Sequence, residues 1–217
     1  MTRIKICCIS SIEEANLAIK VGASALGLVS EMPSGPGVIS EKLISEIAAN
    51  TPPAISTFLL TSKQNVSEIV QQHARCRTNT IQICDRIIQG SYTQLKQNLP
   101  GIKIVQVIHI NDIESVEEAI VISNHVDAIL LDSGNQNLAT KELGGTGRTH
   151  DWTLSKKIVY SVNIPVFLAG GLNSENVADA IKQVQPFGVD VCSGVRTKGK
   201  LDVNKLKSFV EIVSSCK

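Results

Sequence analysis

The chain has 217 residues, 43% of them hydrophobic, and 21 lysine and arginine residues against 20 aspartate and glutamate residues give a net charge of +1. This balance argues against nucleic acid or an anionic membrane as a partner, and 3% aromatic residues argue against base stacking. No apolar run approaches the ~20 residues of a membrane span, and no signal peptide opens the chain. We therefore expect a cytoplasmic protein with six reduced cysteines.

Short apolar runs alternate with segments of helical spacing along the whole chain. The expected strands cover residues 3–9, 25–29, 54–60, 80–84, 103–108 and 127–132, followed by two runs that begin at Pro165 and Phe187. The expected helices begin near Ser10 or Ser11, Ser40, Ser62 or Asn65, Ser91, Asp112, Trp152, Glu175 and Val203. A glycine, Gly22, closes the first of these helices.

Eight strands in regular alternation with eight helices predict a parallel sheet, and eight such units close most simply into a barrel. An open, doubly wound sheet is the alternative, but no Gly-x-Gly-x-x-Gly follows the first strand. No linker or low-complexity tract interrupts the alternation. The sequence therefore predicts an α/β protein whose residues 1–217 form a single (β/α)8 TIM-barrel domain.

Two apolar runs near the C-terminus end abruptly in glycine. They are Pro165–Gly171 and Phe187–Gly194, and each precedes a helical pattern. Glycine lets backbone N–H groups approach a ligand, and the following helix adds a positive dipole end. Two consecutive turns of this kind are a common phosphate site after strands seven and eight of a barrel. The alternative is that both are only tight turns, but their tandem arrangement favours a phosphate site.

Candidate acid–base residues stand at the C-terminal ends of expected strands, where barrels carry their chemistry. Asp132 follows four apolar residues, so partial desolvation would raise its pKa and make it a proton donor; the alternative is a cap or ion-pair partner. Cys7 can supply a thiolate, or can be only a small buried apolar residue. Cys8 is not expected to act with Cys7, because neighbours on a strand point to opposite faces. His109 ends the fifth strand and fits a wall position better than a catalytic one.

A metal site is not expected. Cys7, Cys84 and Cys192 can all reach the barrel mouth, but no metal-ligand spacing supports them. The glycine-rich stretch from Gly144 to Trp152 indicates a lid or a ligand clasp, and the alternative is a long connection that needs glycine for its turns. Within this stretch, Arg148 faces either an anion or solvent.

Motifs along the whole chain resemble those of phosphoribosylanthranilate isomerase and occur in that family's order. They are residues 5–9, 27–29, 81–82, 129–132, 144–147, 151–152, 168–173, 175–177 and 189–195. The resemblance implies a cofactor-free barrel of tryptophan biosynthesis that performs an Amadori rearrangement on a phosphorylated aminoaldose. It also implies a small-molecule phosphorylated sugar as partner and a monomer or homodimer.

The same resemblance assigns roles to individual residues. Cys7 is implied as the general base and Asp132 as the general acid. Asp190 is implied to lie close to the substrate and to orient it. The implied substrate- and phosphate-binding positions are Gly145, Gly170, Gly171, Ser193 and Gly194.

Three positions depart from the family pattern. Cys8 stands where glycine is usual and Cys84 where histidine is usual. The loop after the second strand lacks the arginine that contacts the anthranilate carboxylate, since no Arg or Lys occurs from Ser30 to Glu41. Arg148 is a candidate replacement. These departures leave open an isomerase-like barrel that acts on, or merely binds, a different phosphorylated amino sugar. An aldolase or epimerase is a weaker alternative, because no strand-end lysine or metal spacing supports it.

Overall fold

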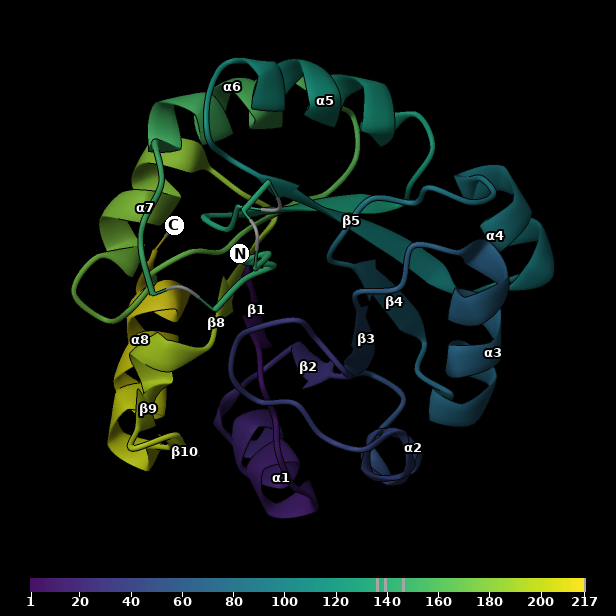
Figure 1. Cartoon of the computed structure of the whole chain (residues 1–217). Coiled ribbons are helices and arrows are strands. Elements are labelled where there is room, and N and C mark those ends of the chain that lie inside the picture. Colours follow the sequence, from purple (N-terminus) through teal and green to yellow (C-terminus); the bar gives the residue numbers. More distant parts are fainter. Residues whose placement is uncertain (136, 139, 146, 217) are drawn as a thin grey trace.

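The apolar runs form the strands of a closed parallel barrel in the computed structural model, which describes residues 1–135, 137–138, 140–145 and 147–216 (Figure 1). The strands are β1 (Arg3–Ile6), β2 (Ala25–Val29), β3 (Ser56–Thr61), β4 (Thr80–Ile83), β5 (Lys103–His109), β6 (Ala128–Asp132), β7 (Val166–Leu168) and β8 (Gly188–Val191). Each strand pairs with the next one in sequence, and β8 pairs with β1. This closure confirms the predicted (β/α)8 barrel and excludes the open sheet.

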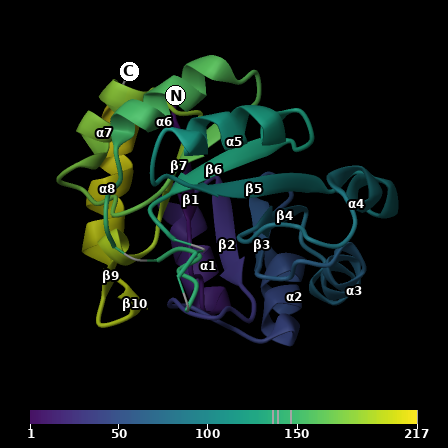
Figure 2. The same cartoon turned by 45° about the horizontal axis from the view of Figure 1, so that its top comes forward.

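The helices form a ring around the barrel (Figures 1 and 2). They are α1 (Ile12–Val21), α2 (Glu41–Asn50), α3 (Val66–Cys76), α4 (Tyr92–Asn98), α5 (Glu114–Ser123), α6 (Trp152–Ser161), α7 (Val177–Val184) and α8 (Val203–Ser215). Side-chain caps fix where most of them begin. Ser11, rather than Ser10, accepts the N–H of Glu14 before α1. In the same way Asn65 rather than Ser62 caps α3, and Asp151 caps α6.

Some boundaries differ from the prediction. Strand β1 ends at Ile6 rather than Ile9, because Cys8 adopts a left-handed conformation with φ of 61° and leaves the strand. Strand β3 starts two residues later and ends one residue later than expected. An unpredicted single 3-10 turn, η1 (Ser193–Val195), and a small hairpin of β9 (Arg196–Thr197) and β10 (Lys200–Leu201) follow β8.

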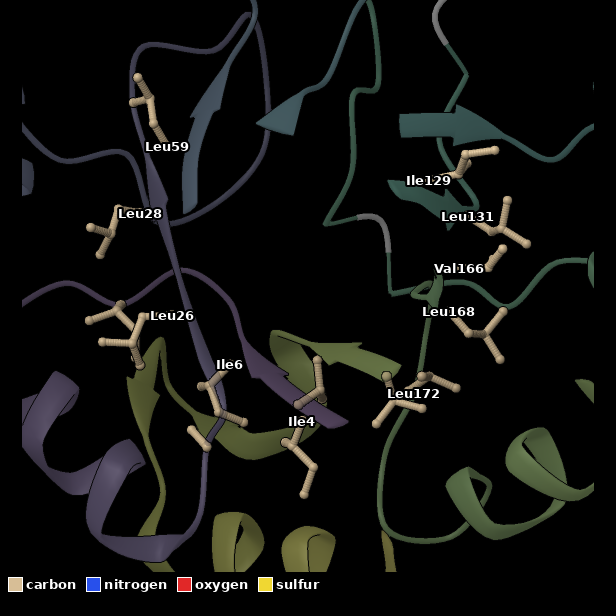
Figure 3. Packing of buried hydrophobic residues seen from close by; sticks show 14 of the residues in the cluster. Ile4, Ile6, Leu26, Leu28, Leu59, Ile129, Leu131, Val166, Leu168 and Leu172 are labelled. Carbon is tan, nitrogen blue, oxygen red and sulfur yellow. The ribbon is translucent and has the colours of Figure 1, made fainter. Parts of the chain in front are cut away.

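Alternation along the strands builds two apolar layers. One lies between the barrel and the helices, and Figure 3 shows side chains such as Ile4, Leu28 and Leu168 in it. The other fills the barrel and includes Phe58 and Phe167, whose rings meet edge to face at 5.9 Å. The same alternation turns the side chains at the strand ends toward the barrel mouth. None of the helices in the described ranges is long and apolar enough to cross a membrane.

Candidate functional site

The ends of several strands surround one cavity at the barrel mouth. Seven of the eight predicted site residues line it: Cys7, Asp132, Gly145, Gly170, Gly171, Asp190 and Ser193. The eighth, Gly194, does not line the cavity but packs against the turn that carries Gly170 and Gly171. The strand-end rule therefore brings the predicted residues to one place.

Asp132 occupies the last position of β6 and is buried, with 8% of its surface exposed. Its Oδ1 accepts the N–H of Ser133 at 2.7 Å, and a Cβ at Gly144 would lie 2.7 Å from its Oδ2. Burial raises the pKa of Asp132, although the Ser133 amide and the charges of His109 and Lys5 oppose the rise. Asp132 joins no ion pair in the part of the chain that is described, so the ion-pair alternative is not supported. The hydrogen bond from the Ser133 N–H fits the cap alternative.

Lys5 and Asp190 form a buried ion pair inside the barrel. Lys5 Nζ lies 3.0 Å from Asp190 Oδ1, and the ammonium also lies 5.2 Å from the centre of the Phe58 ring. Burial alone would lower the pKa of Lys5, but the negative charges of Asp190 and Cys7 outweigh it and raise the pKa, so Lys5 is a cation. Burial raises the pKa of Asp190, and Lys5 opposes that rise. Sequence reasoning missed this role for Lys5, although it lies within the expected strand of residues 3–9, two residues before Cys7.

Cys7 and Cys8 line the same cavity, so the expectation that they face opposite sides is wrong. The alternation rule applies only within a strand, and β1 ends before both residues. Cys7 Sγ packs against Gly27, where a Cβ would lie 2.8 Å from the sulfur. Cys8 Sγ lies 2.8 Å from Cys192 Sγ, which follows β8.

The two predicted glycine turns touch each other. A Cβ at Gly194 would lie 2.0 Å from the carbonyl oxygen of Leu172, so only glycine fits there. Gly170 and Gly171 have φ values of 84° and 60°, the left-handed region that glycine adopts without strain. Their amides donate no backbone hydrogen bond to any residue that the structure describes. The turns therefore present available N–H groups beside the cavity.

Two loops meet over the cavity. Ser34 Oγ, in the loop after β2, donates to the carbonyl of Lys141 at 2.6 Å, and a Cβ at Gly145 would lie 2.6 Å from Pro36 Cδ. Thr146, in the predicted Gly144–Gly147 motif, lies outside the described residues. Arg148 forms an ion pair with Glu142 and is not among the residues that line the cavity.

Two other predicted strand-end residues, His109 and Cys84, differ in whether they line the cavity. His109 Nε2 lies 3.1 Å from the carbonyl oxygen of Cys84, and His109 is not among the lining residues. Cys84 lines the cavity, and burial raises the pKa of its thiol to about 12. Within the described residues, no three His, Cys, Asp or Glu side chains are grouped so that they could hold a metal ion.

The cavity lies at the C-terminal ends of the strands of a closed (β/α)8 barrel, and a thiol and carboxyl groups line it. Barrel enzymes have their active sites at this end, so the fold and the site define the protein as a member of this class. The comparison with protein families is more specific. Residues 4–212 match the family described as N-(5'-phosphoribosyl)anthranilate (PRA) isomerase. The chain belongs to this family of isomerases.

Individual relatives agree with the family match. The N-(5'-phosphoribosyl)anthranilate isomerase of Methanocella arvoryzae is 34% identical over 98% of each chain. Isomerase 2 of Methanosarcina mazei is 36% identical over 96% of this chain and 92% of its own. The crystal structure of the Thermotoga maritima isomerase superposes with a TM-score of 0.82 at 28% identity, over 99% of each chain. Another phosphoribosylanthranilate isomerase structure, in complex with reduced 1-(o-carboxyphenylamino)-1-deoxyribulose 5-phosphate, gives a TM-score of 0.80 at 26% identity, also over 99% of each chain.

Proposed function

We propose that the chain converts N-(5-phosphoribosyl)anthranilate to 1-(2-carboxyphenylamino)-1-deoxyribulose 5-phosphate, the Amadori rearrangement of tryptophan biosynthesis. Membership of the isomerase family supports this reaction. The observation that carries the residue assignment is that Cys7 and Asp132 line one cavity beside the paired glycine turns. A thiol and a carboxylic acid around one substrate can supply the base and the acid that the rearrangement needs.

Asp132 acts first, as the general acid. Its buried position keeps the protonated form available, because burial raises its pKa. The proton passes to the furanose ring oxygen of the substrate, and the ring opens to a protonated imine. The positive nitrogen of this imine acidifies the neighbouring C2′ proton.

Cys7 then acts as the general base. Its thiolate removes the C2′ proton and gives an enolamine, and tautomerisation of the enolamine yields the ketone. Lys5 supports this step as a positioning residue, because its buried positive charge interacts favourably with a Cys7 thiolate. Asp190 holds the Lys5 ammonium at 3.0 Å and keeps that charge in place.

The substrate phosphate binds to main-chain N–H groups. The available amides of Gly170 and Gly171 and the touching turn of Ser193 and Gly194 support this assignment. The aryl group takes the side of the cavity that Met32, Pro36 and Leu143 line. In this arrangement the substrate spans the cavity, from its phosphate at the turns after the last two strands to its aryl group near the loop after β2.

The test is steady-state kinetics of Cys7→Ser and Asp132→Asn with N-(5-phosphoribosyl)anthranilate. We expect each variant to lose about 10²–10⁴-fold in kcat, because each removes one proton-transfer group. Both should still bind the reduced product analogue. Cys216→Ser near the C-terminus and the exposed Asp179→Asn on α7 are matched controls that should keep wild-type activity. Wild-type activity in either site variant would refute the assignment.

One observation favours a second substrate. The described residues that line the cavity include Asp132 and Asp190 but no lysine or arginine that could pair with the anthranilate carboxylate. A phosphorylated amino sugar with a neutral substituent would not need such a partner. Turnover of that substrate with little turnover of the anthranilate compound would support this alternative.

A further inference from the structure

Two thiols from neighbouring strand ends almost touch beside the proposed base. Cys8 Sγ lies 2.8 Å from Cys192 Sγ. The two residues follow β1 and β8, which pair through Ile6 and Val191. A disulfide bond is about 2.05 Å long, so the sulfur atoms need only a small approach to bond.

The backbone around Cys8 fixes this thiol in place. Cys8 has a φ of 61°, and Arg196 Nη2 donates to its carbonyl oxygen at 2.5 Å and to that of Cys7 at 3.3 Å. Arg196 is itself held by Glu14 at 3.0 Å. A Cβ at Gly37 would lie 2.5 Å from Cys8 Cβ, so the loop after β2 covers the thiol. Cys8 is therefore held toward Cys192 rather than toward solvent.

The two thiols differ in reactivity. The neighbouring Cys8 thiol lowers the pKa of Cys192, and Arg196 lowers it further, although burial opposes them. Hydrogen bonds with Cys192 and Cys7, together with burial, raise the pKa of Cys8. Cys192 is also the less buried of the pair. Cys192 is therefore the attacking thiolate and Cys8 the resolving thiol.

We propose that Cys8 and Cys192 form a reversible disulfide at the active-site mouth by exchange with a small-molecule disulfide. The Cys192 thiolate attacks one sulfur of that disulfide and releases the other half as a thiolate. The Cys8 thiol then loses its proton to solvent, attacks Cys192 Sγ and releases the second half. The protein pair loses two electrons and two protons, and the small disulfide is reduced to two thiols.

The disulfide would affect both the proposed base and the proposed phosphate site. Cys8 follows Cys7 directly, and Cys192 precedes the turn of Ser193 and Gly194. Drawing the two sulfurs together displaces the base and the phosphate-binding amides relative to each other. A misplacement of 1 Å can reduce an enzymatic rate by about a hundredfold. We expect the oxidised protein to lose about tenfold or more in kcat/KM and to regain it on reduction.

The test is to equilibrate the whole protein with oxidised glutathione, alkylate the remaining thiols under denaturing conditions and map the cysteine peptides by mass spectrometry. We expect a Cys8–Cys192 linked peptide that dithiothreitol abolishes. Cys7→Ser should form the same link, and Cys8→Ala should carry glutathione on Cys192 instead. Cys76 and Cys84 should stay alkylatable after unfolding, because burial raises the pKa of each to about 12.

A wild-type protein without the Cys8–Cys192 peptide, or one whose link involves Cys7, would refute the proposal. The activity ratio of oxidised to reduced protein gives a second readout, which should fall in the wild type and stay near one in Cys192→Ser. An unchanged ratio in the wild type would refute the effect on the active site. Because the peptide map does not depend on turnover, its outcome is separate from that of the proposed reaction.

Discussion

At the scale of single residues, the site concentrates charge in a barrel that is otherwise apolar. Lys5 is fully buried, and Asp132 and Asp190 are each 8% exposed. Buried charges of this kind are expensive unless they are paired, and Lys5 neutralises Asp190 directly. Asp132 has no such partner among the described residues and instead shifts toward its protonated form. Burial raises the pKa of Asp190 as well, but there the Lys5 ammonium at 3.0 Å opposes the rise.

This arrangement predicts a pH profile. Activity should fall as the pH rises through the pKa of Asp132, because the acid must be protonated and its pKa lies above the ordinary carboxyl value. In Lys5→Met this fall in kcat/KM should move to higher pH, because the charge of Lys5 lowers the pKa of Asp132. A purely structural role for Lys5 would change the size of kcat/KM and leave the pH of this fall unchanged.

The sequence predicted the positions of Cys7 and Asp132 because both follow from where an apolar strand ends. It did not predict the contact of Cys8 with Cys192. That contact depends on the left-handed conformation of Cys8, which Arg196 supports from far along the chain. Long-range hydrogen bonds of this kind leave no local pattern. Lys5 was predictable in principle, since it lies two residues before Cys7 within the expected strand of residues 3–9.

At the scale of elements, the turn after β7 is packed against the backbone of the loop after β6. A Cβ at Gly171 would lie 2.7 Å from the carbonyl carbon of Arg148 and 2.8 Å from the amide nitrogen of Thr149. The conformation and the lack of space both require glycine. Helix starts were predicted well because caps are local. The contact between the two loops over the cavity was not predicted, because Ser34 and the Lys141 carbonyl come together only in the folded barrel.

Gly171→Ala should therefore impair phosphate binding. We expect KM for the phosphorylated substrate to rise about tenfold, the loss of one or two good hydrogen bonds, as the turn and its amides shift. Gly101→Ala is the matched control, because its φ is also positive, at 86°, but its Cβ would meet nothing within 4 Å. Gly101→Ala should lose about 1 kcal/mol of unfolding free energy, and Gly171→Ala should lose more, because its Cβ also meets backbone atoms. An unchanged KM in Gly171→Ala would contradict the phosphate assignment.

At the scale of the whole molecule, an ion pair joins the first helix to the hairpin beyond the last strand. Arg196 Nη1 lies 3.0 Å from Glu14 Oε1, and the two side chains are 7% and 14% exposed. Glu14 also accepts the N–H groups of Leu201 and Ser10. The contact lies beside the seam where β8 closes on β1, so it ties the two ends of the barrel together.

Glu14→Gln should reduce the unfolding free energy by about 2 kcal/mol, because it leaves the Arg196 charge partly buried without its partner. Burial would raise the pKa of Glu14, but the hydrogen bonds from Arg196, Leu201 and Ser10 outweigh it and lower the pKa. The stabilisation is therefore complete above the unfolded-state pKa and disappears as the pH falls through the folded-state value. Denaturant titrations of wild type and variant should converge at acid pH. The exposed neighbour Glu13→Gln is the control, and a loss as large in that variant would contradict the account.

The arrangement of a base, an acid and an anion site around one cavity is tested most directly by a crystal structure with the reduced product analogue bound. We predict Cys7 Sγ on one side of the sugar chain at C2′ and the Asp132 carboxyl on the other, near the position of the ring oxygen. The phosphate should lie on the amides of Gly170, Gly171, Ser193 and Gly194. A phosphate bound away from these turns, or a sugar chain that contacts only one of Cys7 and Asp132, would contradict the proposed mechanism.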